Sequence, residues 1–125
     1  MRIAAVYDGV RESAGPYFTE DHPRIADPAE RERVARFLNG GTPVVGTTGR
    51  DTDRIDADRG RVVPLSFRTD GHWVWSDALA YYVEAHGLSP EPELLRHIAA
   101  HNYQPDTPDE DAIRQAVQAV RPGQG

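Results

Sequence analysis

The middle of the chain alternates hydrophobic and polar residues with a period of two. Residues 61–67 form a β-prone run, and Trp73 and Trp75 lie two positions apart in a second run. Asp70-Gly71 stands between the runs and predicts a type I′ turn, because that turn requires positive φ at both central residues. The pattern therefore predicts a β-hairpin whose two tryptophans point to the same face.

The pattern then changes to a helical period. Ser76 is a suitable N-cap, and Leu79, Tyr82 and Val83 recur on one side of the predicted helix. Gly87 predicts a left-handed stop at its end. We expect this helix to pack on the hairpin, with at least one of the two tryptophans in the core between them.

Three further helices are predicted from caps and apolar stripes. Asp27-Pro28 and Glu30 supply a cap, a first-turn proline and a capping-box acid for a helix that ends at residues 39–41. Two more helices are expected over residues 89–101 and 108–120. The stripe of the last helix either completes the core or forms a dimer contact, and the sequence leaves both open; it consists of Ile113, Ala116, Val117 and Val120.

The remaining segments are two strands and two loops. Residues 2–7 and 43–48 are β-prone. Residues 10–26 have no clear period and are predicted to form an irregular surface loop. Residues 49–60 alternate charges of both signs, so we expect them to be exposed, with a helical turn near Ile55.

The order of these elements predicts an α+β fold. Strands and helices do not alternate as repeated βαβ units, and a hairpin lies in the middle. Residues 1–125 are expected to form a single domain. It would contain a mixed or antiparallel sheet of about four strands, with helices mainly on one face.

Composition and charge exclude several classes of function. A net charge of −6 and a pI near 5.3 argue against nucleic acid and anionic membranes as partners, since both require a basic surface. The chain has no cysteine, which excludes disulfides, zinc-thiolate sites and thiol catalysis. No apolar run approaches the length of a membrane span, and the N-terminus does not resemble a signal peptide, so we expect a cytoplasmic protein.

Two patterns of metal-ligating residues are incomplete. His97 and His101 have the i, i+4 spacing of a chelating pair, but Ile98 stands where a zincin has its glutamate, and His86 could be a third ligand only if two helices pack suitably. The aspartates of residues 51–58 lack the glycine and the closing glutamate of a calcium loop. We therefore predict neither a metal site nor a cofactor.

A small-molecule site is one open alternative. Residues 40–50 contain glycines and hydroxyls that allow a backbone to approach a phosphate, although they match no nucleotide-binding fingerprint. Together with the hairpin, spanning residues 68–77, they would form the site of a small enzyme or sensor for an anionic small molecule or nucleotide. Its candidate ligand-binding residues are Thr47, Thr48, Arg50, Arg68, Asp70 and His72.

Residues 31–98 resemble a type of small actinobacterial protein without a known activity. The resemblance lies in Arg33-Val34 to Thr48, Val62-Val63-Pro64, Arg68 to Trp75 with its Asp-Gly-x-Trp-x-Trp motif, Tyr81-Tyr82, His86-Gly87-Leu88, Pro90, Pro92 to Leu95, and His97-Ile98. It implies a shared scaffold of hairpin and Tyr-Tyr helix and brings no catalytic residues. In size and acidity the chain is also similar to the immunity partners of bacterial toxins.

The leading hypothesis is a non-enzymatic, protein-binding domain with an immunity or regulatory role. No catalytic constellation is complete, and residues 76–125 carry most of the excess negative charge, which would favour a partner with a basic surface. Residues 10–26 would insert into that partner. The candidate contact residues are Tyr17, Phe18, Tyr81, Glu84, Glu91 and Glu93.

Overall fold

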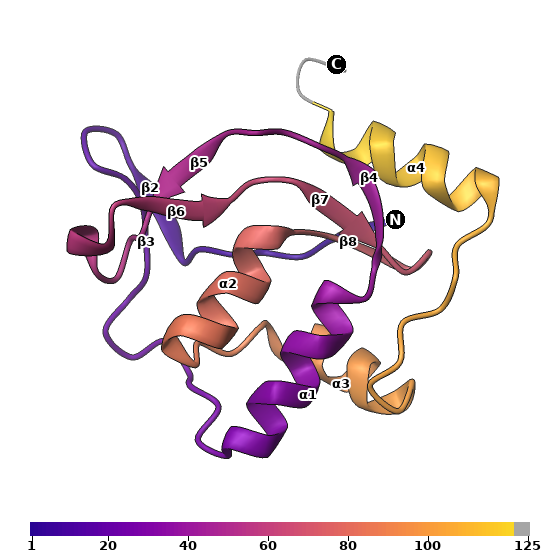
Figure 1. The fold of residues 1–125 in the computed structure, drawn as a ribbon, viewed down its shortest axis with the longest axis horizontal. Helices are drawn as coiled ribbons and strands as arrows, with labels where there is room; N and C mark the ends of the chain where they lie inside the picture. The colour runs from indigo at the N-terminus through magenta and orange to yellow at the C-terminus, as the bar shows by residue number, and fades with distance from the viewer. Residues whose placement is uncertain (122–125) are drawn as a thin grey trace.

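The protein has a four-stranded sheet with helices on both faces (Figure 1). The computed structural model of the chain describes residues 1–121. The sheet has the order β1 (Arg2–Ile3), β8 (Trp73–Ser76), β7 (Phe67–Thr69) and β4 (Thr42–Val45). Strand β1 is parallel to β8 and the other pairs are antiparallel, so the sheet is mixed and the predicted α+β fold is confirmed.

Helices α1 (Pro28–Asn39), α2 (Asp77–His86) and α3 (Pro92–Ala100) cover one face of the sheet. Helix α4 (Glu110–Val120) contacts β4, β7 and β8 and lies apart from the other three (Figure 1). In the apolar stripe of α4, Ala116 is fully buried and the other three side chains are half-buried. Within residues 1–121, none of the helices combines the length and hydrophobicity needed to cross a membrane.

The hairpin and the helix that follows it form as their local sequence predicts. Ser76 accepts a hydrogen bond from Ala78 N, and Gly87 ends α2 with a φ of 67°. The backbone N–H groups of Gly87 and Leu88 then donate to Val83 O and Tyr82 O, which satisfies the last carbonyls of the helix. Helix α3 begins three residues later than predicted and α4 two residues later, and α4 is capped by Asp109.

Helix α1 also has its predicted bounds, but its capping box is incomplete. Asp27 accepts from Ala29 N as expected. Glu30 does not return a hydrogen bond to the cap, because its carboxylate accepts from Tyr103 Oη at 2.9 Å and from Arg33 at 2.8 Å. The side chain is therefore used to attach the segment after α3 to α1.

Residues 10–26 are more regular than predicted. Strand β2 (Gly9–Arg11) pairs antiparallel with β3 (Gly15–Tyr17), and Gly15 at the turn has a φ of 81°. Asp8, just before this hairpin, binds residues that follow it: its carboxylate accepts hydrogen bonds from Thr19 N and Thr19 Oγ1 and lies 2.9 Å from His22 Nδ1. The prediction of an irregular loop was wrong for residues 10–17, because backbone pairing on either side of the Gly15 turn orders a segment that has no apolar period.

Residues 49–60 are also not a fully exposed loop. Strand β5 (Arg50–Thr52) pairs with β6 (Arg61–Pro64), and a short 3₁₀ turn covers Ala57–Arg59. Ile55 itself is exposed, but Asp53 is buried with only 1% of its surface accessible. Strand β6 contacts α2, so this part of the chain extends the core.

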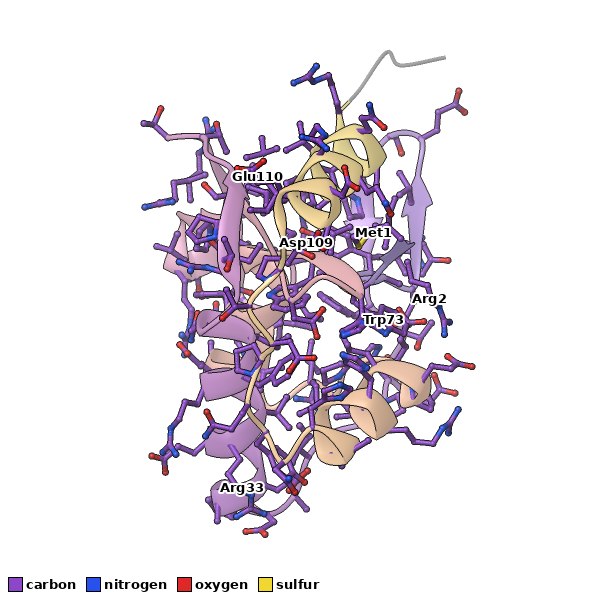
Figure 2. The ribbon with its side chains drawn as sticks, turned by 90° about the vertical axis from the view of Figure 1, so that its right-hand side faces the viewer. Met1, Arg2, Arg33, Trp73, Asp109 and Glu110 are labelled. Atoms are coloured by element: carbon purple, nitrogen blue, oxygen red, sulfur yellow. The ribbon has the colours of Figure 1, made fainter. Side chains whose placement is uncertain are left out.

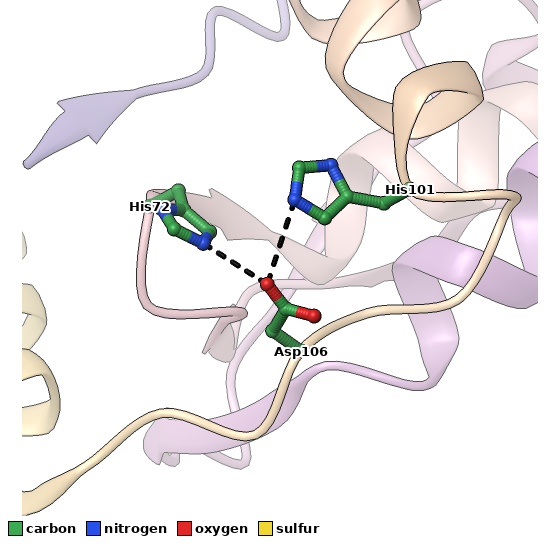
Figure 3. Close-up of side chains that lie close together, drawn as sticks. All are labelled: His72, His101 and Asp106. Carbon is green, nitrogen blue, oxygen red and sulfur yellow. Dashed lines mark hydrogen bonds and ion pairs between the residues drawn. The ribbon is translucent and has the colours of Figure 1, made fainter.

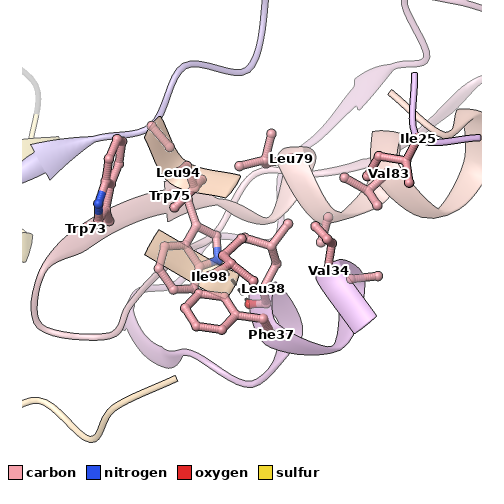
Figure 4. Packing of buried hydrophobic residues seen from close by; sticks show 13 residues of the cluster. Ile25, Val34, Phe37, Leu38, Trp73, Trp75, Leu79, Val83, Leu94 and Ile98 are labelled. Atoms are coloured by element: carbon pink, nitrogen blue, oxygen red, sulfur yellow. Dashed lines mark hydrogen bonds between the residues drawn. The ribbon is translucent and has the colours of Figure 1, made fainter. Parts of the chain in front are cut away.

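The core lies between the tryptophan face of the sheet and helices α1, α2 and α3 (Figure 4). Both tryptophans are buried, which confirms the prediction that at least one would be. Trp75 Nε1 donates to Leu38 O at 3.0 Å, so its polar atom is satisfied inside the core. At the sheet edge, the Arg2 guanidinium lies over the ring of Trp73 at 4.1 Å (Figure 2).

Candidate metal centre

Three metal-ligating side chains from distant parts of the chain converge at one end of the sheet (Figure 3). They are His72 in the β7–β8 turn, His101 at the end of α3 and Asp106 in the connection to α4. Asp106 Oδ2 lies 3.1 Å from His72 Nε2 and 3.5 Å from His101 Nε2. All three ligand atoms lie within 4.8 Å of one another.

The β7–β8 turn positions His72. Among the turn residues only Gly71 has positive φ, at 93°, so the predicted type I′ turn, which requires positive φ at both Asp70 and Gly71, is wrong. The reason is the side chain of Asp70, whose Oδ1 accepts from the backbone N–H groups of His72 and Trp73 at 2.9 and 3.0 Å. The turn that carries His72 is thereby fixed by a buried carboxylate.

Asp70 also connects this turn to α3. Its Oδ2 lies 2.6 Å from His97 Nε2, and the Asp70 side chain is fully buried. Burial alone would raise the pKa of Asp70, but the hydrogen bonds from His97 and from the backbone N–H groups of Trp73 and His72 outweigh it and lower the pKa. The Nε2 atom of His97 is engaged by Asp70 and is therefore not directed to the three-residue cluster.

His101 is oriented by the helix that carries it. Its Nδ1 lies 2.9 Å from His97 O, one turn earlier in α3. A carbonyl only accepts hydrogen bonds, so Nδ1 carries the hydrogen, and in the neutral ring Nε2 has the free lone pair. Histidine ligands of metals commonly donate their second ring N–H to such a backbone carbonyl.

The chain reverses after α3 to bring Asp106 to the two histidines. Asn102 and Tyr103 have φ values of 54° and 60°, a left-handed conformation that few non-glycine residues adopt. Hydrogen bonds from Tyr103 N to Ile98 O and from Tyr103 Oη to the Glu30 carboxylate hold this reversal. The position of Asp106 therefore depends on contacts between α1 and the segment after α3.

Two of the three ligand-to-ligand distances in the cluster are close to those around a small tetrahedral ion, and the third, between the two histidines, is at most 4.8 Å. Zinc bonds to nitrogen and oxygen of about 2.0 to 2.2 Å imply ligand-to-ligand edges of about 3.3 to 3.6 Å. The 3.5 Å edge of Asp106 with His101 lies in this range, and the 3.1 Å edge with His72 falls just short of it. The His72 and Asp106 side chains are 53% and 54% exposed, so an ion can enter from solvent.

A second histidine–carboxylate cluster is enclosed and has a structural role. Asp53 Oδ2 lies 2.7 Å from His86 Nε2 and accepts from Tyr81 Oη at 2.6 Å, while Oδ1 accepts from the backbone N–H groups of Ile55 and Asp56. Burial would raise the pKa of Asp53, but these hydrogen bonds lower it to about 2. Because Asp53 is buried and has four donors, this cluster attaches the loop of residues 53–56 to α2.

The residues expected to bind an anionic ligand are not brought together. Thr47 lies beside Ser66, which is four residues before Asp70 along β7, a separation of about 13 Å. Arg68 pairs with Asp77 at 2.9 Å and donates to Gly41 O. The expectation that the six residues would form one pocket between the Gly49 turn and the hairpin was therefore wrong. Of the six, only His72 belongs to the three-residue cluster, and Asp70 fixes the turn that carries it. Thr47, Thr48 and Arg50 are exposed at the opposite end of the hairpin.

Most of the expected partner-contact residues have partners within the chain. Phe18 packs against Tyr7 and Tyr82, and Tyr17 lies below the Arg11 guanidinium at 4.3 Å. The other four lie on α2, α3 and the segment between them. Tyr81 donates to Asp53, Glu84 accepts from Asn39, Glu91 accepts from Ala5 N, and Glu93 is exposed at 3.9 Å from Arg96.

The sequence did not predict the three-residue cluster, because its residues are far apart in the chain and form no short motif. His97 and His101 do not act as the chelating pair that their spacing suggests, because His97 is bound to Asp70. His86, the possible third ligand, is bound to Asp53. His101 instead meets a residue from the hairpin turn and one from the connection to α4. The Asp70-Gly71 turn signal was the one local indication that His72 would be presented at the end of the sheet.

Comparison with known proteins found no match, so a functional proposal rests on the geometry of the site. No protein-family model matches the chain. Neither a curated protein nor a solved structure matches it. The resemblance to small actinobacterial proteins stays a prediction.

Proposed function

We propose that the protein binds a divalent transition-metal ion, with Zn²⁺ the best match, through His72, His101 and Asp106. The observation that carries this proposal is the convergence of three ligand atoms from three chain segments within 4.8 Å. The backbone carbonyl of His97 supports it further, because it fixes the ring of His101 in the orientation a metal ligand requires.

The ligand set favours transition metals over calcium or magnesium. Two imidazole nitrogens and one carboxylate suit Zn²⁺, Fe²⁺ or Ni²⁺, whereas Ca²⁺ and Mg²⁺ prefer sites made of oxygen atoms. With no cysteine in the chain, thiolates cannot compete as ligands. In this proposal Asp70 is a positioning residue, since it fixes the turn of His72 and binds no metal.

The test is a zinc titration of protein freed of metal with a chelator. Calorimetry and elemental analysis after gel filtration are expected to give one Zn²⁺ per chain and no comparable binding of Mg²⁺. His101→Ala and Asp106→Ala each remove a ligand and are expected to weaken binding by well over about tenfold. Asp58→Ala serves as the control, because Asp58 is an exposed carboxylate on the 3₁₀ turn of residues 57–59. Equal binding by all four proteins, or none by the wild type, would refute the site.

A second candidate function is binding of a protein partner with a basic surface. The observation that favours it is a group of exposed carboxylates at the start of α4, where Asp109 and Glu110 stand (Figure 2), followed by Asp111. Arg114 is the cation of this group and is paired with Asp111. The excess negative charge would accelerate association with a cationic surface.

In this second reading the protein acts in the cytoplasm as an immunity or regulatory partner. Tagged protein would be exposed to lysate and washed at low and high salt, with Asp109→Asn/Glu110→Gln compared with Asp21→Asn/Glu20→Gln on the segment after β3. A single stoichiometric partner that is released by salt and lost only in the first variant is the expected result. Capture that is insensitive to both salt and the α4 substitutions would contradict it.

A further inference from the structure

The arrangement of the proposed metal centre also bears on its reactivity. Among the described residues, the group that can surround one ion contains three side chains. The nearest further imidazole is that of His97, and its Nε2 lies 2.6 Å from Asp70. A four-coordinate ion at this site therefore has one position without a protein ligand, which distinguishes catalytic from structural zinc sites.

Space for a small molecule lies next to the proposed metal centre. A hollow of about 380 Å³ separates the β7–β8 turn from the start of α4. One wall is made of Asp70, Gly71 and His72, and the other includes Asp106, Asp109 and Ala112. Since His72 and Asp106 belong both to this hollow and to the cluster, a molecule in the hollow would contact an ion held by them.

We infer that the metal-loaded protein hydrolyses small carboxylic esters or related carbonyl compounds with a metal-bound hydroxide, an inference that rests on the proposed zinc site. A water molecule on the open position would lose a proton to solvent near neutral pH, because zinc lowers the pKa of bound water to about 7. The hydroxide oxygen bonds to the carbonyl carbon, and the bond from that carbon to the leaving oxygen breaks. The leaving alkoxide takes up the proton of the former hydroxide, directly or through solvent, which leaves a carboxylate, and water then replaces this carboxylate on the ion.

The charge of the hollow restricts the substrate. Asp109 stands in its wall, and Glu110 and Asp111 follow on the exposed first turn of α4. Arg114 offsets one of these charges, and Asp106 already reduces the charge of the proposed ion. The remaining carboxylates therefore repel anions at a distance more than the ion attracts them. Neutral or cationic esters are therefore the expected substrates, and phosphate monoesters are not.

The experiment measures hydrolysis of 4-nitrophenyl acetate by zinc-loaded, chelator-treated and variant protein. We expect the loaded protein to exceed both the metal-free protein and an equal concentration of free Zn²⁺ by about tenfold or more. The rate is expected to rise with pH to a plateau above neutrality. It should be lost in His101→Ala and Asp106→Ala and retained in Asp58→Ala, and 4-nitrophenyl phosphate should not be hydrolysed.

The hydrolysis inference and the proposed zinc site are contradicted by different experimental outcomes. One zinc per chain with hydrolysis no faster than that of free Zn²⁺ would overturn the inference and leave the site intact. Absence of zinc binding would overturn both. A zinc-dependent dimer in light scattering, together with a Co²⁺ spectrum unchanged by added azide, would show that a second chain fills the open position, which also overturns the inference.

Discussion

Asp53 and Asp70 are two buried aspartates that share three hydrogen-bond donors of the same kind, and Asp53 has Tyr81 as a fourth. In each, one carboxylate oxygen accepts from two backbone N–H groups of its own loop, and the other accepts from a histidine on a helix. Asp53 holds its loop to α2, and Asp70 holds the hairpin turn to α3. A buried carboxylate is tolerated because these donors replace water, and removing it would leave several of them unpaired.

Gly41 shows how closely the backbone approaches the core. A Cβ atom at this position would lie 2.5 Å from Trp75 Cζ2 and 3.1 Å from Arg68 Cβ, and neither neighbour is the end of a flexible side chain. We expect Gly41→Ala to lower the free energy of unfolding by about 1 to 3 kcal/mol, as overpacking does in a close-packed core.

Urea unfolding followed by tryptophan fluorescence would measure this loss. Gly46→Ala is the matched control, because a Cβ atom there meets nothing within 4 Å and is expected to change the free energy of unfolding by less than about 0.5 kcal/mol. Equal changes in the free energy of unfolding for Gly41→Ala and Gly46→Ala would show that a Cβ atom at Gly41 does not clash with Trp75.

At the scale of single elements, α2 is the most predictable part of the structure. Ser76, the apolar positions and Gly87 each act within a few residues of one another, so the sequence alone identifies both ends of the helix. Gly87 has a φ of 67°, and a Cβ atom there would also lie 2.6 Å from Arg31 Nη2. The long Arg31 side chain can move away, so most of the destabilisation caused by a substitution would come from the left-handed backbone conformation.

Gly87→Ala is therefore expected to lower the free energy of unfolding by about 1 to 2 kcal/mol. Urea unfolding monitored by far-UV circular dichroism would measure the change, with Gly46→Ala again as the comparison. A substitution without effect would mean that the end of α2 can adopt another conformation.

Elements that depend on distant contacts could not be predicted from local signals. The turn of the β2–β3 hairpin is attached to the rest of the chain by a hydrogen bond from Arg54 to Ala14 O, and Asp53 is buried by its contacts with α2. Neither contact is visible in the periodicity of the local sequence. The turn type was wrong for a related reason. Asp70-Gly71 was interpreted from its backbone preference, whereas the Asp70 side chain bonds the following N–H groups and a helix more than twenty residues away.

At the scale of the whole molecule, the candidate metal centre is a product of the complete fold. The sheet presents His72, α3 presents His101, and the reversal at Asn102 and Tyr103 returns Asp106 to them. That reversal is attached to α1 through Tyr103 and Glu30. The sequence predicted the α+β architecture and the hairpin, but the three ligands are separated by lengths of chain that no motif specifies.

The buried Asp53 also gives the whole molecule a defined response to acid. The residues around its carboxylate are His86 and Tyr81 on α2 and Asp56 and Arg59 on its own loop. Its pKa is about 2 in the folded protein, compared with about 3.9 for an unperturbed aspartate. Because the pKa of Asp53 is lower in the folded protein than in the unfolded chain, its ionised carboxylate stabilises the fold at pH values above the unfolded-state pKa. This stabilisation is lost as the pH falls through the folded-state pKa.

Asp53 is therefore expected to contribute about 2 kcal/mol to the free energy of unfolding at pH 5 and above, with most of it lost between about pH 4 and pH 2. Urea unfolding of the wild type and Asp53→Asn from pH 6 to pH 2.5 would measure this dependence. The asparagine has no charge to titrate, so the difference in the free energy of unfolding between the two proteins should become smaller across that range. Asp58→Asn, at an exposed carboxylate, should follow the wild type throughout. A gap that stays constant with pH would mean that Asp53 stabilises the fold through hydrogen bonds that do not depend on its charge.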